Sequence, residues 1–190
     1  MIHYIKNKEM TVELSIEEHG ASTQKGNIGH FELLPSPIFK ALVKNRNGES
    51  ILISSLCDWQ STEVQACGEY TNILFVSNKF IVELSVEISF KYENDSIVWR
   101  ARVNNNSSQW SVMSINYPTP VIKREKYDLF VPRFGGRIIK DASKIDYVYK
   151  NNYPGTLTMQ YFALYSQDSG IYFGVEDEKA AVKNFALEIK

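Results

Sequence analysis

Hydrophobic and polar residues alternate most regularly over residues 79–103. Apolar side chains occupy every second position over 82–92, and the alternation resumes over 97–103 after the turn-forming residues 93–96. A period of two is typical of a strand with one buried face, so this segment predicts a long β-hairpin. A first strand of about a dozen residues, at about 3.3 Å per residue, would be roughly 40 Å long. Such a ribbon cannot bury its apolar face alone, so a second layer is expected.

Shorter apolar stretches predict further strands along the rest of the chain. We expect them at 11–17, 38–43, 50–56, 72–76, 111–117, 127–132, 156–165 and 171–175. The last segment, 182–189, fits both helical and strand spacing, and we favour a strand. Polar and glycine-bearing stretches predict turns or loops at 19–29, 45–48, 58–70, 104–108, 133–137 and 153–155. Many strands and no long helix predict an all-β fold, a two-layer antiparallel β-sandwich.

Length and composition add limits to this interpretation. A chain of 190 residues with no internal repeat and no low-complexity linker predicts a single β-sandwich domain spanning 1–190. A net charge of −1 without a basic run gives no support for nucleic acid binding. No apolar run approaches the 18 or so residues of a membrane span, so no membrane partner is expected. The first residues do not resemble a signal peptide, which predicts a cytoplasmic location if the N-terminus is native. Otherwise the chain is one part of a larger protein.

Cysteine and histidine spacing argues against a metal or a cofactor. Cys57 and Cys67 are ten positions apart, and in a domain with its own core free thiols are expected more often than a disulfide. The histidines His3, His19 and His30 have no ligand spacing. No glycine-rich loop precedes a helix, so nucleotide binding has no support.

Acid catalysis would need paired carboxylates. The candidates are Asp128, Asp141, Asp146, Asp168, Glu176 and Asp177. A glycosidase needs two of them across one cleft, about 5 to 9.5 Å apart according to mechanism. None lies in an apolar context that would desolvate it, so no catalytic residue is expected within this chain.

Carbohydrate binding uses aromatic faces together with planar polar groups, and the sequence offers both. Trp99 faces inward on the predicted hairpin and is expected in the core. Trp59 in a predicted loop and Trp110 after a predicted turn are candidates for stacking on a sugar ring. Arg133 and Arg137 flank two glycines and could bind a hydroxyl or carboxylate. The alternative is that both arginines pair with local acids.

A series of short motifs near the C-terminus resembles a known family. The motifs are YPGTLTMQY at 153–161, AL at 163–164, GIYFGVED at 170–177 and K-N-F at 183–185. Their order is similar to the "YPG … MQ … AL … GLY … D … K-x-F" series in the N-terminal domain of a poorly characterised group of bacterial glycoside hydrolases. Residues 97–105, 115–118 and 131–137 resemble further motifs of that domain. The resemblance covers most of the chain and is most specific from Ile97 onward.

The resemblance implies a fold and a role. Such domains resemble the galactose mutarotase-like β-supersandwich and precede a (β/α)8 barrel that carries the catalytic carboxylates. This chain lacks that barrel. The resemblance therefore implies a non-catalytic accessory domain of a larger glycoside hydrolase, whose partners are carbohydrate and the catalytic barrel of the same polypeptide. The expected contacts are the loop 133–137 and the segment around Tyr153.

Three alternatives remain open. A stand-alone carbohydrate-binding module would stack Trp59 or Trp110 on a sugar. An aldose epimerase-like enzyme would need a pair of histidines and a glutamate, and no histidine of this chain fits that pattern. A purely structural interaction domain would show a large apolar patch and no polar cleft.

Overall fold

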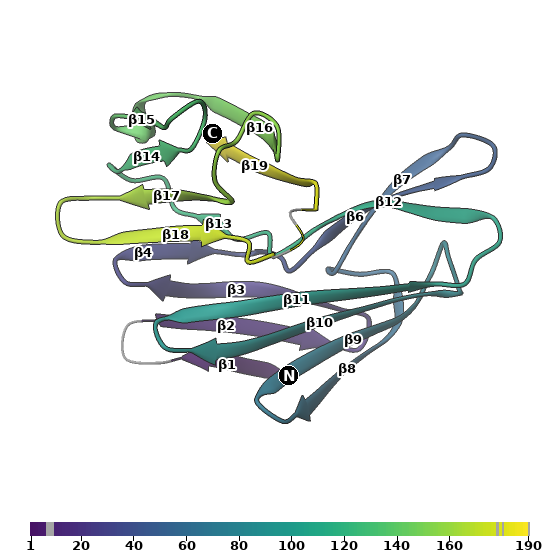
Figure 1. Ribbon diagram of the computed structural model, residues 1–190. Coiled ribbons are helices and arrows are strands. Elements are labelled where there is room, and N and C mark those ends of the chain that lie inside the picture. Colours follow the sequence, from purple (N-terminus) through teal and green to yellow (C-terminus); the bar gives the residue numbers. More distant parts are fainter. Residues whose placement is uncertain (7–9, 178, 180, 190) are drawn as a thin grey trace. The chain divides into compact units, whose positions relative to one another are not determined.

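The computed structural model describes residues 1–6, 10–177, 179 and 181–189 (Figure 1). The protein is nearly all β, with antiparallel sheets, which confirms the predicted all-β sandwich class. In the described part of the chain the only helix is a 3₁₀ turn, η1 (Ala142–Lys144). No helix there is long and apolar enough to cross a membrane.

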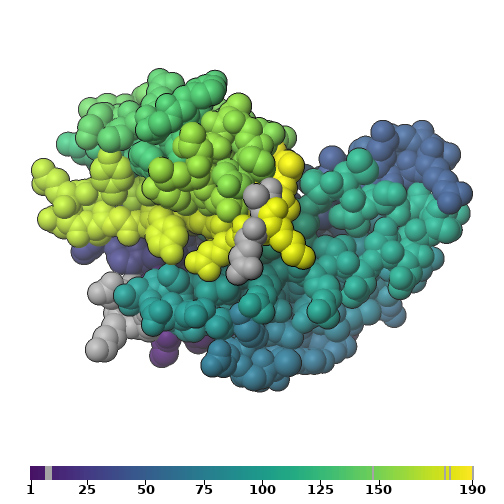
Figure 2. All heavy atoms as spheres, viewed as in Figure 1, coloured from purple at the N-terminus to yellow at the C-terminus, as the bar shows by residue number. Residues whose placement is uncertain are grey.

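Contacts within the chain group the residues into two compact units. Unit 1 comprises Met1–Ile28 and Glu32–Ile122, and unit 2 comprises Gly29–Phe31 and Lys123–Lys190. In the space-filling view, most of unit 1 is coloured purple to teal, and residues 123–190 of unit 2 are green to yellow (Figure 2). That the whole chain folds as a single domain stays a prediction.

Unit 1 contains three sheets. The first has the order β1-β2-β3-β4-β13, with β5 paired to β3: β1 (Ile2–Lys6), β2 (Met10–Glu17), β3 (Gly20–Ile28), β4 (Phe31–Leu34), β13 (Val121–Ile122) and β5 (Ser36–Pro37). The second has the order β11-β10-β9-β8: β11 (Ser96–Asn105), β10 (Leu84–Glu93), β9 (Tyr70–Asn78) and β8 (Trp59–Cys67). The third has the order β12-β6-β7: β12 (Trp110–Asn116), β6 (Lys40–Asn45) and β7 (Ser50–Ser54).

The hairpin β10–β11 confirms the pattern that predicted it. Ile88 lies opposite Ala101, and Phe90 lies opposite Trp99, so the apolar positions of both strands share one face. The first strand begins later than expected, at Leu84. Residues 79–83 leave the ladder because Asn78 and Ile81 form hydrogen-bonded turns, and Val82 is 67% exposed instead of inward.

The core of unit 1 joins the inward faces of its sheets. Leu14 of β2, Phe75 of β9, and Val86 and Ile88 of β10 are fully buried in one cluster. Phe39 lies at its centre, with its ring edge-on to that of Phe75 at 5.0 Å between centroids. This shared cluster provides the second layer that the long hairpin requires.

Two predicted loops are strands instead. The stretch 19–29 contains β3, and 58–70 contains β8, which pairs with β9 along its length. Polar side chains suggested loops, but the backbone of these stretches pairs with that of β2 and β9. Gly20 and Gly26 mark close approach of another backbone, because a Cβ atom at either position would lie 2.1 Å from a carbonyl oxygen.

Unit 2 contains two smaller sheets. The first has the order β15-β14-β17-β18: β15 (Arg137–Ile139), β14 (Asp128–Val131), β17 (Tyr161–Tyr165) and β18 (Gly170–Gly174). In the second, β16 (Tyr147–Tyr153) pairs with β19 (Lys183–Ile189). The favoured strand at the C-terminal end is thus confirmed, and Phe185 and Ile189 on it are buried. The strand expected over 156–165 is shorter, since residues 154–160 form turns and bends.

Candidate functional site

A tight turn joins β14 to β15 at the glycine-bearing loop that the sequence singled out. The N–H of Gly136 donates to the carbonyl of Arg133 at 3.1 Å. Phe134 and Gly135, between them, have φ values of 49° and 97°. Positive φ at both central residues is the signature of a type I′ turn, whose twist matches that of its flanking strands. We call residues 133–137 the Arg-Phe turn.

The Arg-Phe turn is anchored to the chain segment that precedes β17. Arg133 forms an antiparallel bridge with Leu157, which is buried. The backbone N–H and the hydroxyl of Thr158 both donate to the carbonyl of Pro132, at 2.9 and 3.0 Å. These bonds hold the turn in place from its N-terminal side.

A ring stack supports the turn from its other end. Gly136 lies so close to Phe130 that a Cβ atom there would be 2.9 Å from the ring. The Phe130 ring in turn stacks on Tyr161 of β17, with 5.7 Å between centroids. The turn is therefore a fixed feature of unit 2 and not a loosely tethered loop.

The turn exposes one aromatic ring and two guanidinium groups. Phe134 is 74% exposed, and the Arg133 guanidinium lies 5.2 Å from its ring centroid. Arg133 and Arg137 are both exposed. Within the described residues neither arginine forms an ion pair, so the alternative that they neutralise local acids is not realised.

Phe134 occupies a backbone conformation that suits it poorly. A φ of 49° lies in the left-handed region, which costs an L-residue roughly 1–2 kcal/mol and is normally given to Gly, Asn or Asp. Its exposed ring buries little apolar surface to offset this cost. Strain of this kind is concentrated at functional sites, so Phe134 joins Arg133 and Arg137 as a candidate contact residue.

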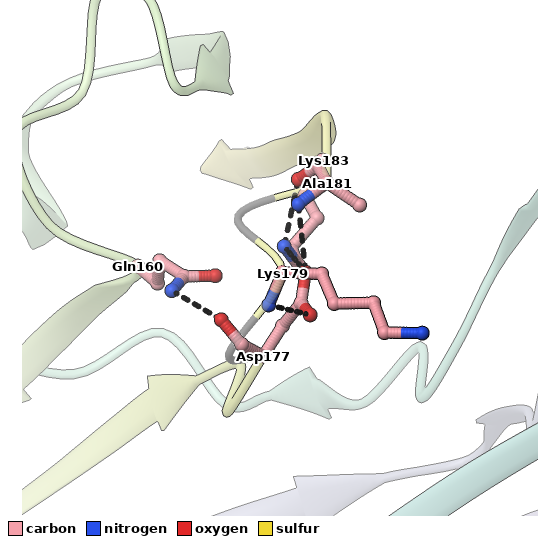
Figure 3. Close-up of polar contacts among 5 residues, drawn as sticks. All are labelled: Gln160, Asp177, Lys179, Ala181 and Lys183. Atoms are coloured by element: carbon pink, nitrogen blue, oxygen red, sulfur yellow. Dashed lines mark hydrogen bonds and ion pairs between the residues drawn. The ribbon is translucent and has the colours of Figure 1, made fainter.

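A second feature of unit 2 is a cluster around the carboxylate of Asp177 (Figure 3). The backbone N–H groups of Lys179 and Ala181 donate to it at 2.9 and 2.8 Å. The ammonium group of Lys183 at the start of β19 forms an ion pair with the same carboxylate. We call these four residues the Asp177 clasp.

The Asp177 clasp brings together motifs that are far apart in the sequence. The ammonium of Lys183 lies 5.8 Å from the ring centroid of Tyr153, a predicted contact residue. The Gln160 side chain donates to the backbone carbonyl of Asp177 at 3.4 Å, and the Gln160 carbonyl accepts from Val175 at 2.9 Å. Tyr153, Gln160, Asp177 and Lys183 belong to the motifs that carry the family resemblance. Tyr153 thus has a structural role in unit 2.

The electrostatics of the clasp lead to a pH prediction. The hydrogen bond from Lys183, followed by those from Lys179 and Ala181, lowers the pKa of Asp177 to about 2. Because this folded-state pKa is below the ordinary value of 3.8, the ionised carboxylate stabilises the fold fully above about pH 4. That stabilisation is lost as the pH falls toward 2. We expect Asp177→Asn to lower the melting temperature at pH 7, and the difference from wild type to shrink below pH 4.

Melting curves recorded from pH 7 down to pH 3 test this prediction. Asp168→Asn is the matched control, because Asp168 is exposed and makes no side-chain hydrogen bond within the described residues. If the melting temperature of the wild type exceeds that of Asp177→Asn by the same amount from pH 7 down to pH 3, the assigned role of the ionised carboxylate is wrong.

Three of the other acids considered for catalysis also have partners. Three ion pairs are present, Asp128 with Lys140, Asp141 with Lys144 and Asp146 with Arg124. Hydrogen bonds from the partner lysines, first among the causes, lower the pKa of Asp128 and of Asp141. A general acid near neutral pH needs a raised pKa, so Asp128 and Asp141 are suited to ion pairing and not to proton donation.

Trp59 does not offer the exposed face that was expected of it. It begins β8, is 3% exposed, and donates its indole N–H to the Ser54 carbonyl at 2.8 Å. Its ring packs against Phe39 and Phe75, with centroid distances of 5.9 and 5.5 Å. The predicted loop around it was wrong, and Trp59 is a core residue.

The other two tryptophans are half-buried. Trp110 begins β12 and packs against the core cluster of unit 1. Trp99 packs on Phe90 at 5.3 Å between ring centroids, which fits its expected place in the core. Neither tryptophan lies near the Arg-Phe turn in the sequence, and both belong to unit 1.

Unit 1 also contains a shallow cleft, a second candidate for a functional site. It has a volume of about 500 Å³ and is lined in part by His19, Cys57, Asp58 and Lys79. The Cys57 thiol donates to Asp58 at 3.3 Å, and this hydrogen bond raises the pKa of the thiol. Asp58 also pairs with Lys79 at 3.6 Å. A raised pKa reduces the thiolate fraction, so the cleft does not activate a nucleophile.

Cys57 and Cys67 are free and exposed, as the sequence favoured. Among the described residues no group of three acidic, histidine or cysteine side chains could hold a metal ion. Of the sequence candidates, the structure brings Arg133 and Arg137 into one turn and places Tyr153 beside Lys183 of the Asp177 clasp. Phe134 was not among the contact residues predicted from the sequence, although it lies there between an arginine and two glycines.

No protein-family model matches this chain, and a search of curated proteins gave no significant match. A functional assignment therefore rests on the geometry of the chain and on the order of its motifs.

Proposed function

We propose that this chain is a non-catalytic accessory β-sandwich of a glycoside hydrolase. It braces a following (β/α)8 barrel and presents the Arg-Phe turn to the carbohydrate cleft. The observation that carries the proposal is an exposed aromatic ring with the Arg133 guanidinium over it, on a turn that is fixed in place and that also carries the exposed Arg137.

The chemistry of the turn suits a sugar. One face of a pyranose ring is lined with C–H groups, which pack favourably on the negative face of an aromatic ring. Its hydroxyl groups and any acidic substituent accept hydrogen bonds from a guanidinium group, which has five donors in a planar fork. Phe134 and its neighbours Arg133 and Arg137 supply both kinds of contact within five residues.

The state of the acidic residues supports a non-catalytic role. Asp128, Asp141, Asp146 and Asp177 all form ion pairs with lysine or arginine side chains. The lowered pKa values of Asp128, Asp141 and Asp177 do not suit a neutral proton donor. The motif order Tyr-Pro-Gly to Lys-x-Phe supports the barrel as the catalytic partner, because in the resembling family this series precedes such a barrel.

Two measurements test the proposal. The coding sequence downstream should show an alternating strand and helix pattern over the next few hundred residues. The 190-residue chain alone should hydrolyse no glycoside, whereas the longer protein should do so. In the longer protein, Phe134→Asn should lower kcat/KM on an oligosaccharide. Absence of the alternating pattern would contradict the bracing role.

A stand-alone carbohydrate-binding module is the second candidate, and the exposed ring of Phe134 favours it equally. It would bind saccharides through the same turn without a barrel downstream. Titration of the chain with an oligosaccharide panel, combined with the downstream sequence, distinguishes the two. The epimerase alternative receives no support from the positions of the histidines.

A further inference from the structure

We propose that the Arg-Phe turn binds an acidic sugar, a pyranose that carries a carboxylate group, in preference to a neutral one. This inference rests on the proposed carbohydrate contact and names its chemical class. It is carried by the charge of the turn, by the contact of Arg133 with the Phe134 ring and by the strain at Phe134.

Among the described residues no acid pairs with the arginines of the turn. Arg133 and Arg137 are exposed and form no ion pair within the described residues. The nearest acid on β14, Asp128, is occupied by Lys140 at 2.5 Å. The turn therefore carries two positive charges within five residues, and an anion bound there is attracted by both.

The placement of Arg133 fits a carboxylate next to a ring. Arg133 begins the turn, and its guanidinium lies 5.2 Å from the Phe134 ring centroid, while Arg137 follows the turn and lies opposite Val131 in the β14–β15 ladder. Both arginines therefore flank Phe134 at the tip of one hairpin. A guanidinium group binds a carboxylate through two parallel hydrogen bonds, which a neutral hydroxyl cannot accept. A uronic acid offers a carboxylate and a C–H face on the same ring.

The strained backbone of Phe134 gives a test of whether its aromatic ring is kept for binding. Asn suits the first central position of a type I′ turn better than Phe does. If the aromatic ring is kept for binding, Phe134→Asn should stabilise the protein and weaken ligand binding at the same time. A rise in melting temperature of roughly 2 °C is expected from relief of the left-handed penalty.

The experiment titrates the 190-residue chain by calorimetry with oligogalacturonate, oligoglucuronate and oligomannuronate. Each is compared with its methyl ester, which keeps the ring and removes the charge. We expect at least one uronate to bind and its ester to bind at least tenfold more weakly. Binding of the uronate should also weaken with added salt. Sodium acetate, titrated alone, should not bind measurably, since it has no ring for Phe134.

Variants locate the site. Arg133→Gln and Arg137→Gln should each weaken uronate binding roughly five- to tenfold, and Phe134→Asn at least tenfold. Arg46→Gln is the control for charge, because Arg46 is exposed on the hairpin turn between β6 and β7. Phe80→Asn is the control for an exposed aromatic ring with a cation over it, Lys79 in that case. Neither control should change binding.

The outcomes separate the two proposals. If uronates and esters bind equally and Phe134→Asn weakens both, the preference for acidic sugars is wrong and the carbohydrate contact stands. If no saccharide of either kind binds, both proposals fail for this chain. Uronate binding that survives Arg133→Gln and Arg137→Gln would move the site away from the turn and overturn the inference.

Discussion

Trp59→Ala is expected to lower the free energy of unfolding by about 3–5 kcal/mol. Trp59 is 3% exposed, and its ring contacts those of Phe39 and Phe75, which are themselves fully buried. Truncation leaves a large cavity beside two rings that cannot both collapse into it. It also removes the donor to the Ser54 carbonyl, so that a partly buried acceptor loses its partner.

Urea unfolding followed by circular dichroism measures this loss. Trp110→Ala is the matched control, since Trp110 is only half-buried and should cost about 1–2 kcal/mol. If Trp59→Ala instead left stability within about 1 kcal/mol of wild type while abolishing saccharide binding, Trp59 would be a stacking residue after all. The stand-alone module that stacks sugar on Trp59 would then regain its support.

Trp59 was wrongly predicted to lie in a loop, because side-chain patterns alone do not indicate every strand. Residues 59–67 alternate only weakly between apolar and polar, because the outer face of β8 is polar and the inner face carries few large side chains. Pairing with β9, the next strand along the chain, makes β8 part of a hairpin closed by Gly68 and Glu69, which its weak alternation did not indicate. The hairpin β10–β11 was predictable because its inner face is consistently apolar, so that alternation alone located it.

The candidate site was predictable in its position and not in its chemistry. Two glycines between Arg133 and Arg137 indicated a turn, and the turn is there. The left-handed conformation of Phe134 follows from the type I′ geometry, which depends on the strands that the turn joins. The motif series ordered Tyr153, Asp177 and Lys183 along the chain, but only the pairing of β16 with β19 shows that they meet.

Gly20→Ala is expected to destabilise the protein by about 3 kcal/mol, although it adds a single methyl group. The new Cβ atom would lie 2.1 Å from the carbonyl oxygen of Leu56 and 2.8 Å from that of Ser55. Both are backbone atoms, so no side-chain rotation can relieve the overlap. β3 would have to move away from the segment that follows β7.

That movement would break a buried polar junction. The Ser55 hydroxyl donates to the Ala21 carbonyl and accepts from the Ile38 N–H, both at 2.7 Å. The Ala21 N–H donates to the Ser55 carbonyl at 2.5 Å. Ser55 is fully buried, so each bond lost leaves a polar group without water to replace its partner.

Gly68→Ala is the control for Gly20→Ala. It distinguishes two reasons for a glycine, the close approach of another backbone and a backbone conformation with positive φ. Gly68 has a φ of 61°, and a Cβ atom there would meet nothing within 4 Å. Alanine at this position costs only the left-handed penalty of about 1–2 kcal/mol. In parallel urea unfolding experiments, Gly20→Ala should therefore lose clearly more stability than Gly68→Ala. Equal losses would mean that β3 can shift freely, and that Gly20 is kept for its conformation and not for the backbone beside it.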